Sequence, residues 1–499
     1  MKKSYAWVAL ALIGAVSCSG GKINSSSLVS STDGTVDEGD IVRDENGNIL
    51  YDNVRLEMWS VTTGDDAKTQ DEIIARFNET YAGMITVQTS HISRYELETQ
   101  LQSTMEFDRE HAPDLLFSHS SRSNEYLERD WLLPLEGYLD KADISLDKDD
   151  YVSSLLDAAT IDGRVYGLPQ DVHSAMVEVR LDILEKNGLN VPHSYAELVE
   201  VCTEAIELAR EGNLWIRGQN SSGYSASEWR KASVSTDYEP FPIAYGDMWV
   251  HEFLGYTAAI QNGGQIVGKD KMPAFDSNEV ANGLQLLRDW SKPSPTSLNR
   301  YAFSKDYGAE YDVGYTPFLS GNALFKLNGP WAYANDLTDF DRDLKNDGGS
   351  DNITTIALSD LFSLDPSSEN ASKIKGEGHA FMLFSTVKST TKACAAMVFA
   401  DWMVNNAGID WARRGHLPSL KSVEQAEEYQ NDPDYLRFIR NWGSCADYVV
   451  IEPTPYYTYI DTYFKNSVRY AMDSSSTKTI ASVLKEQTAD CIDYIELNR

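Results

Sequence analysis

The chain has 499 residues, of which 42% are hydrophobic and 11% aromatic, and its net charge is −33 at pH 7. This length allows two or three domains with full cores, and the composition is that of a globular protein rather than a disordered one. The strong negative charge repels phosphate backbones and anionic lipid surfaces, so it disfavours nucleic acid as a partner.

The first eighteen residues, MKKSYAWVALALIGAVSC, have the pattern of an export signal. Lys2 and Lys3 precede an apolar stretch over 5–16, which is shorter than the about twenty apolar residues that cross a bilayer. Cys18 followed by Ser-Gly-Gly resembles a bacterial lipobox, although Ala15 stands where leucine is usual. The resemblance implies cleavage before Cys18 and lipidation of its sulfur. Simple secretion is the alternative.

Residues 19–53 are rich in Ser, Gly, Asp and Asn and have no helical or strand period, which predicts a flexible tether. Ordered structure is expected to begin with an alternating strand at 54–60. The next segments are predicted as a helix over 66–81, a strand over 85–92, a helix over 94–107 and a strand over 112–118. This series predicts a parallel, doubly wound sheet, whose ligands bind at the carboxyl ends of the strands.

Two extended segments around Pro169 come next, followed by helices over 194–212 and 278–291 with a loop over about 212–240 between them. Apolar extended segments are then expected at 322–331, 353–359 and 378–386. The chain ends in helices that include 392–406 and 479–497. No short internal repeat is present, which argues against a solenoid.

Motifs for metal binding and catalysis are weak or missing. The chain has no C-x-x-C pair, and the acidic stretch DFDRDLKNDGGSD from Asp339 lacks the glycine and closing glutamate of a calcium loop. No G-x-S-x-G, phosphate-binding loop or H-E-x-x-H motif occurs. We therefore expect no metal, no cofactor and no catalytic residue. We expect Cys445 and Cys491 either to form a disulfide or to be buried free thiols, and we favour the free thiols.

Several motifs occur in an order that resembles one family. They are APDLLFS with WLLPLEGYL, RVYGLPQD, LDILEKNGLNVPHSYAELVE, QNGGQIV, AFDSNEV, FLSGNALFKLNGPWAY and RRGHLPSL. Their order resembles that of the extracellular solute-binding proteins of ABC importers (family 1), the sugar-binding lipoproteins typified by maltose-binding protein. The resemblance extends from about residue 54 to the C-terminus. Asp130-Trp131 and Ser194-Tyr195 depart from the family pattern.

The resemblance implies an α/β, two-lobed periplasmic-binding-protein fold of type II. Each lobe is expected to be a doubly wound, mostly parallel sheet flanked by helices, and hinge strands join the lobes. Hinge closure is then stabilised by a ligand that touches both lobes only in the closed state. The expected division is a signal peptide at 1–17, a lipidated tether at 18–53, lobe one at 54–173 with 360–405, and lobe two at 174–359 with 406–499.

The implied function is that of a lipid-anchored, monomeric receptor in the cell envelope. It is expected to capture a carbohydrate, with an oligosaccharide favoured, on the extracytoplasmic face of a membrane (periplasm or cell surface). The permease subunits of an ABC importer are its expected partners. Two alternatives stay open, namely an outer-membrane glycan-capture lipoprotein of another porter and a secreted carbohydrate-active enzyme.

Sugar recognition uses aromatic faces against pyranose rings, and acids or amides as partners for hydroxyl groups. We expect the ligand-binding residues at the carboxyl ends of strands and at the positions that the resemblance places at the cleft. They are Trp59, Asp65, Ser118, Ser121, Arg122, Asp171, His173, Tyr245, Asp247, Trp249, Trp331, Glu377, Tyr457 and Tyr459.

Several of these candidates have a purely structural alternative. Trp331 could pack in a core, Asp65 could interact with a helix dipole, and His173 could be a structural hydrogen-bonding group. Ser118 and Ser121 replace the aromatic and acidic residues of the best-known relative, which weighs against a maltodextrin but not against a sugar.

Overall fold

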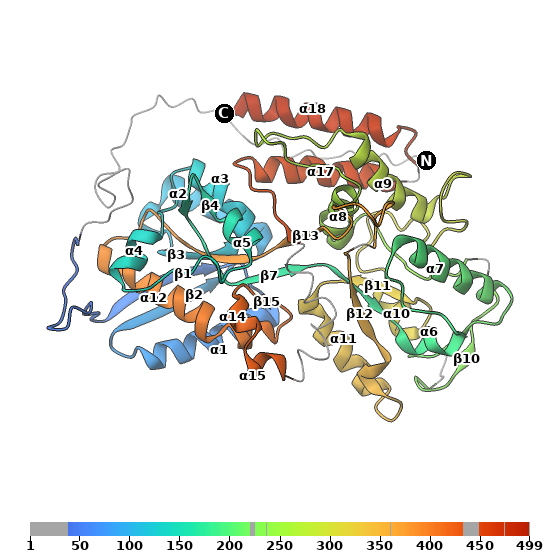
Figure 1. Cartoon of the computed structure of the whole chain (residues 1–499), viewed down its shortest axis with the longest axis horizontal. Helices are drawn as coiled ribbons and strands as arrows, with labels where there is room; N and C mark the ends of the chain where they lie inside the picture. Colours follow the sequence, from blue (N-terminus) through green and yellow to red (C-terminus); the bar gives the residue numbers. More distant parts are fainter. Residues whose placement is uncertain are drawn as a thin grey trace, which may run out of the picture.

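The computed structural model describes residues 38–219, 225–235, 237–359, 361–432, 449–473 and 475–498. Two α/β lobes lie side by side, and short strands between them carry the chain from one lobe to the other (Figure 1). This arrangement follows from the sequence pattern, in which strands and helices alternate through most of the chain.

The sheet of the first lobe has the strand order β2-β1-β3-β14-β6. β1 (Val54–Ser60) lies parallel to β2 (Ile85–His91) and to β3 (Leu115–His119). β14 (His379–Leu383) is antiparallel to both β3 and β6 (Leu168–Pro169). The predicted parallel series β1, β2 and β3 is therefore confirmed, and a distant part of the chain completes the sheet.

Helices cover both faces of this sheet. Leu115 and Phe117 of β3 belong to a core cluster with residues of α1 and α12, whereas Leu116 between them belongs to a cluster with residues of α2. Because successive strand residues point to opposite faces, one short strand contributes to two cores. The first-lobe helices are α1 (Gly64–Thr80), α2 (Arg94–Phe107), α3 (Ser123–Glu128), α4 (Glu136–Lys141), α5 (Ser153–Ala158) and α12 (Thr390–Asn406), and a short hairpin joins β4 (Thr160–Ile161) to β5 (Arg164–Val165).

The sheet of the second lobe centres on β8 (Met176–Val179), which lies between β11 (Phe325–Asn328) and β12 (Thr354–Ala357). Both pairings are antiparallel: β8 runs away from the hinge, and its two neighbours run in the opposite direction. The predicted two-lobed α/β fold is confirmed. The prediction of a mostly parallel sheet is wrong for the described strands of the second-lobe sheet, because both of its pairings are antiparallel.

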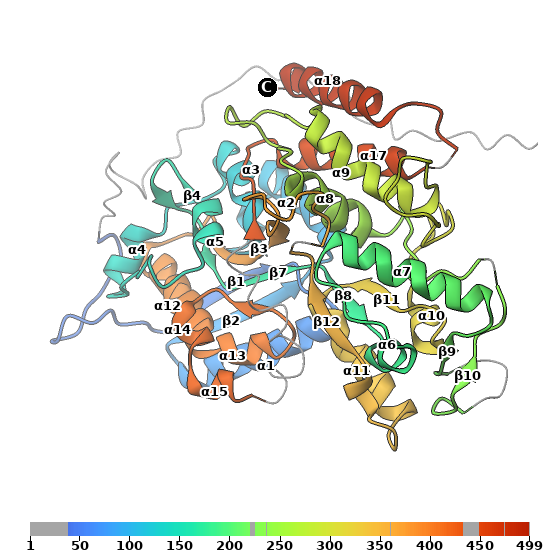
Figure 2. The same cartoon turned by 45° about the vertical axis from the view of Figure 1, so that its right-hand side comes forward.

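The helices of the second lobe surround one large core cluster that includes the fully buried Trp290. Two of them, α17 and α18, lie along the same edge of the molecule in Figures 1 and 2 and pack against each other and α9. A short strand pair, β9 (Trp215–Ile216) with β10 (Arg230–Lys231), stands where only a loop was predicted. The helices are α6 (Leu181–Asn187), α7 (Tyr195–Arg210), α8 (Gly255–Gln261), α9 (Asn278–Ser291), α10 (Tyr315–Ser320), α11 (Pro330–Asp343), α17 (Tyr457–Met472) and α18 (Ile480–Asn498).

The hinge is a small sheet of order β15-β7-β13-β16. β7 (Asp171–Ser174) leads into β8 of the second lobe, and β13 (Ile374–Glu377) leads back into β14 of the first. β15 (Leu417–Pro418) pairs with β7, and β16 (Val449–Val450) pairs with β13. Figure 2 shows β7 between the two lobes, where it links the two sheets.

Two of the predicted lobe boundaries differ from the structure. Leu361 and Phe362 pack in the core of the second lobe, so the chain returns to the first lobe only at β13. Trp411 and Leu420 pack in the core of the first lobe, together with the short helices that surround them. Apolar side chains in these segments decide the placement, since each must be buried against the nearest core. These short helices are α13 (Gly408–Ala412), α14 (Lys421–Glu424) and α15 (Glu427–Gln430).

The segment predicted as a flexible tether is attached to the first lobe from Glu38 onward. Glu38 forms an ion pair with Lys141 of α4 at 2.7 Å, and Ile41, Ile49 and Tyr51 pack against the first-lobe core. The prediction of a tether over 38–53 is therefore wrong, because these apolar side chains bury their surface against the first lobe although the segment is polar in composition.

Some sequence predictions fall outside the described residues. They include the signal peptide, Cys18 and the part of the tether up to residue 37, as well as Cys445 and hence its pairing with Cys491. Cys491 itself is buried. Within the ranges that the structure describes, no helix combines the length and the apolar character needed to span a membrane.

The hinge turn at Gly378 leaves no space for a side chain. A Cβ atom there would lie 2.3 Å from the carbonyl oxygen of Asp171 and 2.4 Å from a methyl carbon of Leu155. We predict that Gly378→Ala lowers the free energy of unfolding by about 2 kcal/mol, because overpacking forces the two hinge strands apart. Urea unfolding measures this change.

Gly314→Ala is the matched control, because its nearest neighbour, the Cγ of Lys326, would lie 3.4 Å away. It should change stability much less. Equal losses in the two variants would contradict the tight hinge contact.

Candidate functional site

A small polar cavity of about 20 Å³ lies between the two lobes. On the first-lobe side, Val61 follows β1, and His119 ends β3. The cavity therefore lies at the carboxyl ends of the parallel strands, where open α/β sheets bind ligands. We call it the interlobe cavity. Its polar lining residues are Arg94, Glu98, Ser118, His119, Ser121 and Arg122 from the first lobe, Glu252, Tyr457 and Asp461 from the second, and Glu377 from the hinge.

Charged side chains connect the lobes across this cavity. A guanidinium nitrogen of Arg94 lies 2.7 and 2.9 Å from the two carboxylate oxygens of Glu252. Lys465 lies 3.4 Å from the same carboxylate and 2.7 Å from Asp461. Burial raises the pKa of Glu252, but Lys465 and Arg94 outweigh it and lower that pKa to about 2. Glu252 is therefore an ionised acceptor held between two cations.

A second contact between the lobes joins Arg122 to Tyr457. The guanidinium carbon of Arg122 lies 4.8 Å from the centre of the Tyr457 ring, and Arg122 also donates a hydrogen bond to Thr458. The aromatic face of Tyr457 is thus already used for a cation–π contact.

The hinge supplies a third wall of the cavity. The backbone N–H of Ser121 donates to Oε1 of Glu377 at 3.3 Å, and Lys375 lies 3.6 Å from Oε2. The side-chain oxygen of Ser121 is buried and makes no hydrogen bond within the described ranges. A ligand hydroxyl that reached it would satisfy a donor or acceptor that is otherwise unpaired.

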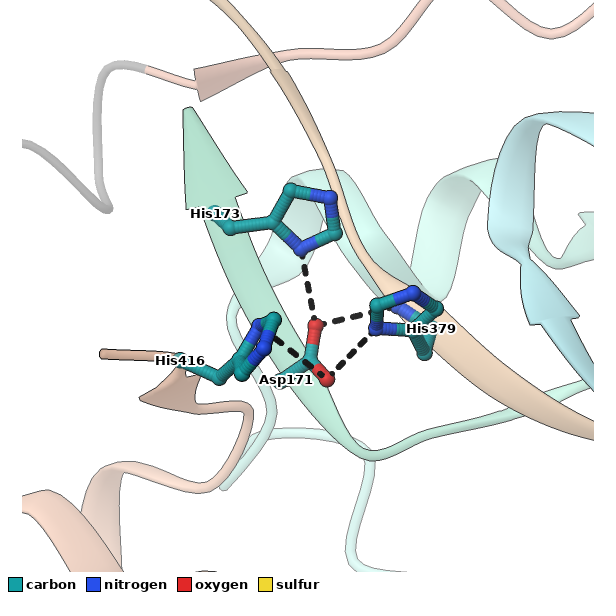
Figure 3. Close-up of side chains that lie close together, drawn as sticks. All are labelled: Asp171, His173, His379 and His416. Carbon is teal, nitrogen blue, oxygen red and sulfur yellow. Dashed lines mark hydrogen bonds and ion pairs between the residues drawn. The ribbon is translucent and has the colours of Figure 1, made fainter. Parts of the chain in front are cut away.

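Behind the cavity lies a group of buried imidazoles around one carboxylate. We call Asp171, His173, His379 and His416 the histidine cluster (Figure 3). His379 connects the cluster to the cavity, since its ring centre lies 4.9 Å from that of the cavity residue His119. The four ligand atoms of the cluster lie within 4.8 Å of one another.

Asp171 is the acceptor at the centre of the histidine cluster. Nδ1 of His173 lies 3.1 Å from Oδ1, and Nδ1 of His379 lies 2.8 Å from Oδ2. The backbone N–H of His379 and the indole N–H of Trp411 donate to the same carboxylate at 3.1 and 2.5 Å. Burial raises the pKa of Asp171, but the charges of His379 and His416 and these hydrogen bonds hold it well below its usual value.

The pKa values of His173 and His416 shift in opposite directions. Burial lowers the pKa of His173 to about 4, so its imidazole is neutral. Burial also opposes protonation of His416, but Asp171 and Asp66 outweigh it and raise the pKa of His416.

Two predicted tryptophans meet beside the histidine cluster. Trp331, at the start of α11, lies 4.9 Å from Trp249 between ring centres and 5.1 Å from His173. Its plane is parallel to that of His416 within 1°, at 5.8 Å. Trp331 belongs to the second lobe and His416 to the first, so these rings form another contact between the lobes.

The predicted site residues therefore fall into separate groups. Ser118, Ser121, Arg122, Glu377 and Tyr457 line the interlobe cavity, whereas Asp171 and His173 belong to the histidine cluster.

Four other candidates have structural surroundings away from the cavity lining. Trp59 and Tyr245 pack against the cores of the first and second lobe. Asp65 is half exposed and pairs with Lys68 at 2.7 Å, and Tyr459 packs against Tyr494 on α18.

Sequence reasoning did not select seven of the residues that the structure places here, which are Arg94, Glu98, His119, Glu252, His379, His416 and Asp461. Arg94 comes at the start of the helix after β2, a position that the rule for strand ends could have identified. Glu252, Asp461, His379 and His416 had no local signal, because only the tertiary fold brings them to the cavity or the cluster.

A larger hollow of about 1090 Å³ lies elsewhere, on the first lobe alone. The N-terminal segment from Glu38 and the helix α4 form its walls. Since it has no second-lobe residue, movement of the lobes cannot enclose a ligand there, and we favour the smaller interlobe cavity as the binding site.

Two α/β lobes joined by crossing strands, with a polar cavity between them, define a class of binding protein that closes around its ligand by bending at the hinge. Residues 72–437 match the family model described as bacterial extracellular solute-binding protein, and the chain belongs to this family. The predicted resemblance to solute-binding proteins is thereby confirmed.

Solved structures of sugar-binding proteins share the fold. The GacH receptor of Streptomyces glaucescens, solved unliganded and with acarbose, is 14% identical and has a TM-score of 0.65 over 88% of this chain and 99% of that chain. The sugar-binding protein MalE of Xanthomonas citri is 16% identical, with a TM-score of 0.67 over 89% and 98%. An ABC substrate-binding protein of Listeria monocytogenes in complex with cycloalternan is 17% identical, with a TM-score of 0.62 over 89% and 100%. The family and these neighbours are binding proteins rather than enzymes.

The buried carboxyl of Asp247 should make stability depend on pH. It accepts hydrogen bonds from the backbone N–H groups of Trp249 and Asp312, yet burial raises its pKa to about 6. Between pH 3.8 and 6 the folded state holds a proton that the unfolded chain has lost, so the free energy of unfolding falls as pH rises through this window.

Asp247→Asn removes this titration and keeps an oxygen acceptor. We predict that the variant gains stability relative to the parent protein as pH rises from 3.5 to 7, by on the order of 2 kcal/mol. Urea unfolding at several pH values measures the difference. A difference that does not change with pH would contradict the assigned pKa.

Proposed function

We propose that this protein is the substrate-binding component of an ABC importer and that it captures a carbohydrate, preferably an oligosaccharide, in the interlobe cavity. One observation carries this proposal. Ser118, Ser121, Arg122, Glu377 and Tyr457 come from distant parts of the chain and from both lobes and the hinge, yet they line one cavity.

The chemistry of the cavity suits a ligand rich in hydroxyl groups. The carboxylates of Glu98, Glu252 and Glu377 accept hydrogen bonds, and the guanidinium groups of Arg94 and Arg122 donate them. A sugar hydroxyl can do both, so it can pair with either kind of group. Tyr457 offers a ring for packing against a pyranose if Arg122 moves aside.

Closure of the lobes on the ligand would supply the signal to the permease. The pairs Arg94–Glu252 and Arg122–Tyr457 already bridge the lobes, so they favour the closed arrangement. Such pairs have to break when the lobes open and a ligand enters. A ligand that contacts both sides would shift the equilibrium further toward closure.

The fold neighbours support a carbohydrate as the ligand class. Two of them were solved with acarbose or cycloalternan, both of which are oligosaccharide-like molecules. In the cell, we propose that a lipid on Cys18 holds the receptor on the extracytoplasmic face of a membrane, close to its permease. The segment between Cys18 and Glu38 would set its reach.

The ligand assignment predicts stabilisation by sugars. In a thermal-shift screen of mono- and oligosaccharides, a ligand at 100 times its dissociation constant should add about 2.7 kcal/mol to the free energy of unfolding. Tyr457→Ala should weaken the binding of that sugar at least tenfold, or by about 1.4 kcal/mol.

Tyr459→Ala is the matched control, because Tyr459 lies two residues away on the same helix and packs against Tyr494 instead. It should retain binding. No shift with any carbohydrate would refute the ligand class, and equal losses in the two variants would refute the site.

If a lipid on Cys18 anchors the protein, its association with membranes should depend on the sulfur atom of this residue. In a bacterial host with lipoprotein processing, the parent protein should sediment with membranes and dissolve in detergent. Cys18→Ser should remove the lipid attachment site and shift the exported protein to the soluble fraction. Membrane association that persists in an exported Cys18→Ser variant would contradict lipidation at this residue.

A further inference from the structure

We infer that Asp171, His173, His379 and His416 form a binding site for one divalent transition-metal ion, with zinc as the best fit. This site is separate from the proposed sugar site and does not depend on it. The four residues come from β7, from the start of β14 and from the segment before β15.

The spacing of the ligand atoms suits a small tetrahedral ion. Zinc lies about 2.0–2.1 Å from nitrogen and oxygen ligands, so neighbouring ligands on a tetrahedron are about 3.3 Å apart. Nδ1 of His173 and Nδ1 of His379 lie 3.1 and 2.8 Å from the nearer oxygens of Asp171, and Nδ1 of His416 lies 3.9 Å from Oδ2. Small rotations of these side chains would bring these three distances close to the tetrahedral value, and all the ligand atoms already lie within 4.8 Å of one another.

The kind of donor selects the metal. Three imidazoles with one carboxylate suit zinc and its neighbours in the first transition row, whereas magnesium and calcium prefer oxygen ligands. All four residues are buried. Because the protein supplies four ligands, the site is closed and therefore structural rather than catalytic.

Within the described residues, one ring nitrogen of the cluster has no hydrogen bond, which is a second and independent sign of a metal ligand. Nδ1 of His416 is buried and makes no hydrogen bond with any residue that the structure describes. The other ring nitrogen, Nε2, lies 3.3 Å from Oδ2 of Asp66. If Nε2–H donates to Asp66, Nδ1 carries a lone pair directed toward the cluster. This is the tautomer that a metal ligand requires.

The surroundings of the cluster resemble the supporting contacts of a metal centre. Metal-binding histidines commonly donate their second N–H to a carboxylate, as His416 can to Asp66. The N–H groups of Trp411 and of the His379 backbone hold the carboxylate of Asp171. The ring of His416 is nearly parallel to those of Trp331 and Trp411, at 5.8 and 4.8 Å between ring centres, and these two contacts favour its present plane.

A bound metal would join three chain segments that form one wall of the cleft. Asp171 and His173 lie on the hinge strand β7, and His379 and His416 belong to segments of the first lobe. The ion would therefore stiffen the surface on which Trp331 of the second lobe rests, without linking the two lobes directly. Zinc should raise stability whether or not sugar is present.

The test uses the mature chain after removal of metals with EDTA. Added ZnCl₂ should bind at one ion per chain and raise the melting temperature, whereas MgCl₂ and CaCl₂ should not. CoCl₂ should give the intense visible absorption of tetrahedral cobalt, and zinc should displace it. His416→Gln should lose the cobalt spectrum and the zinc stabilisation.

His111→Ala is the matched control, because this exposed histidine pairs with Asp108 far from the cluster. It should keep both signals. Loss of both signals in His111→Ala, their retention in His416→Gln, or no stoichiometric zinc binding to the parent protein would each overturn the proposal and leave a metal-free hydrogen-bonded cluster. The cobalt spectrum of the parent protein decides the question even if a variant fails to fold. Sugar binding is measured separately, so either proposal can fail alone.

Discussion

The carboxylate of Asp171 holds together the segments on which the whole arrangement depends. It accepts hydrogen bonds from His173 on its own strand, from the backbone and side chain of His379, and from the indole of Trp411. A fully buried carboxylate is stable only when its oxygens are paired in this way. The same contacts fix β7 against the start of β14 and against α13, so one charge determines where the hinge lies relative to the first lobe.

The position of the interlobe cavity follows from this hinge. Glu377 is one residue from the turn that approaches Asp171, and its carboxylate accepts from the backbone of Ser121 after β3. The hinge, the ends of the parallel strands and the start of α17 thus meet at one place. Opposite charges from the two lobes, such as Arg94 and Glu252, then pair across it although the chain as a whole is strongly acidic.

Local pattern predicted most of the regular structure. The strand Val54–Ser60 and the helix Arg94–Phe107 were predicted to the residue, because period 2 and period 3.6 are clear there. The helix Tyr457–Met472 was missed because its aromatic residues were interpreted as ligand contacts. Glu252 and His416 could not be selected from sequence, since their partners are more than 150 residues away along the chain and only tertiary packing brings them together.

The central claim is that the interlobe cavity encloses a carbohydrate. A crystal structure of the protein grown with a mixture of oligosaccharides tests it most directly. The account predicts electron density for a sugar between the lobes, with hydroxyl groups in hydrogen-bonding contact with Arg122 and Glu377 and a ring near Tyr457. An empty cavity at saturating sugar, or sugar bound on a surface of one lobe alone, would contradict it.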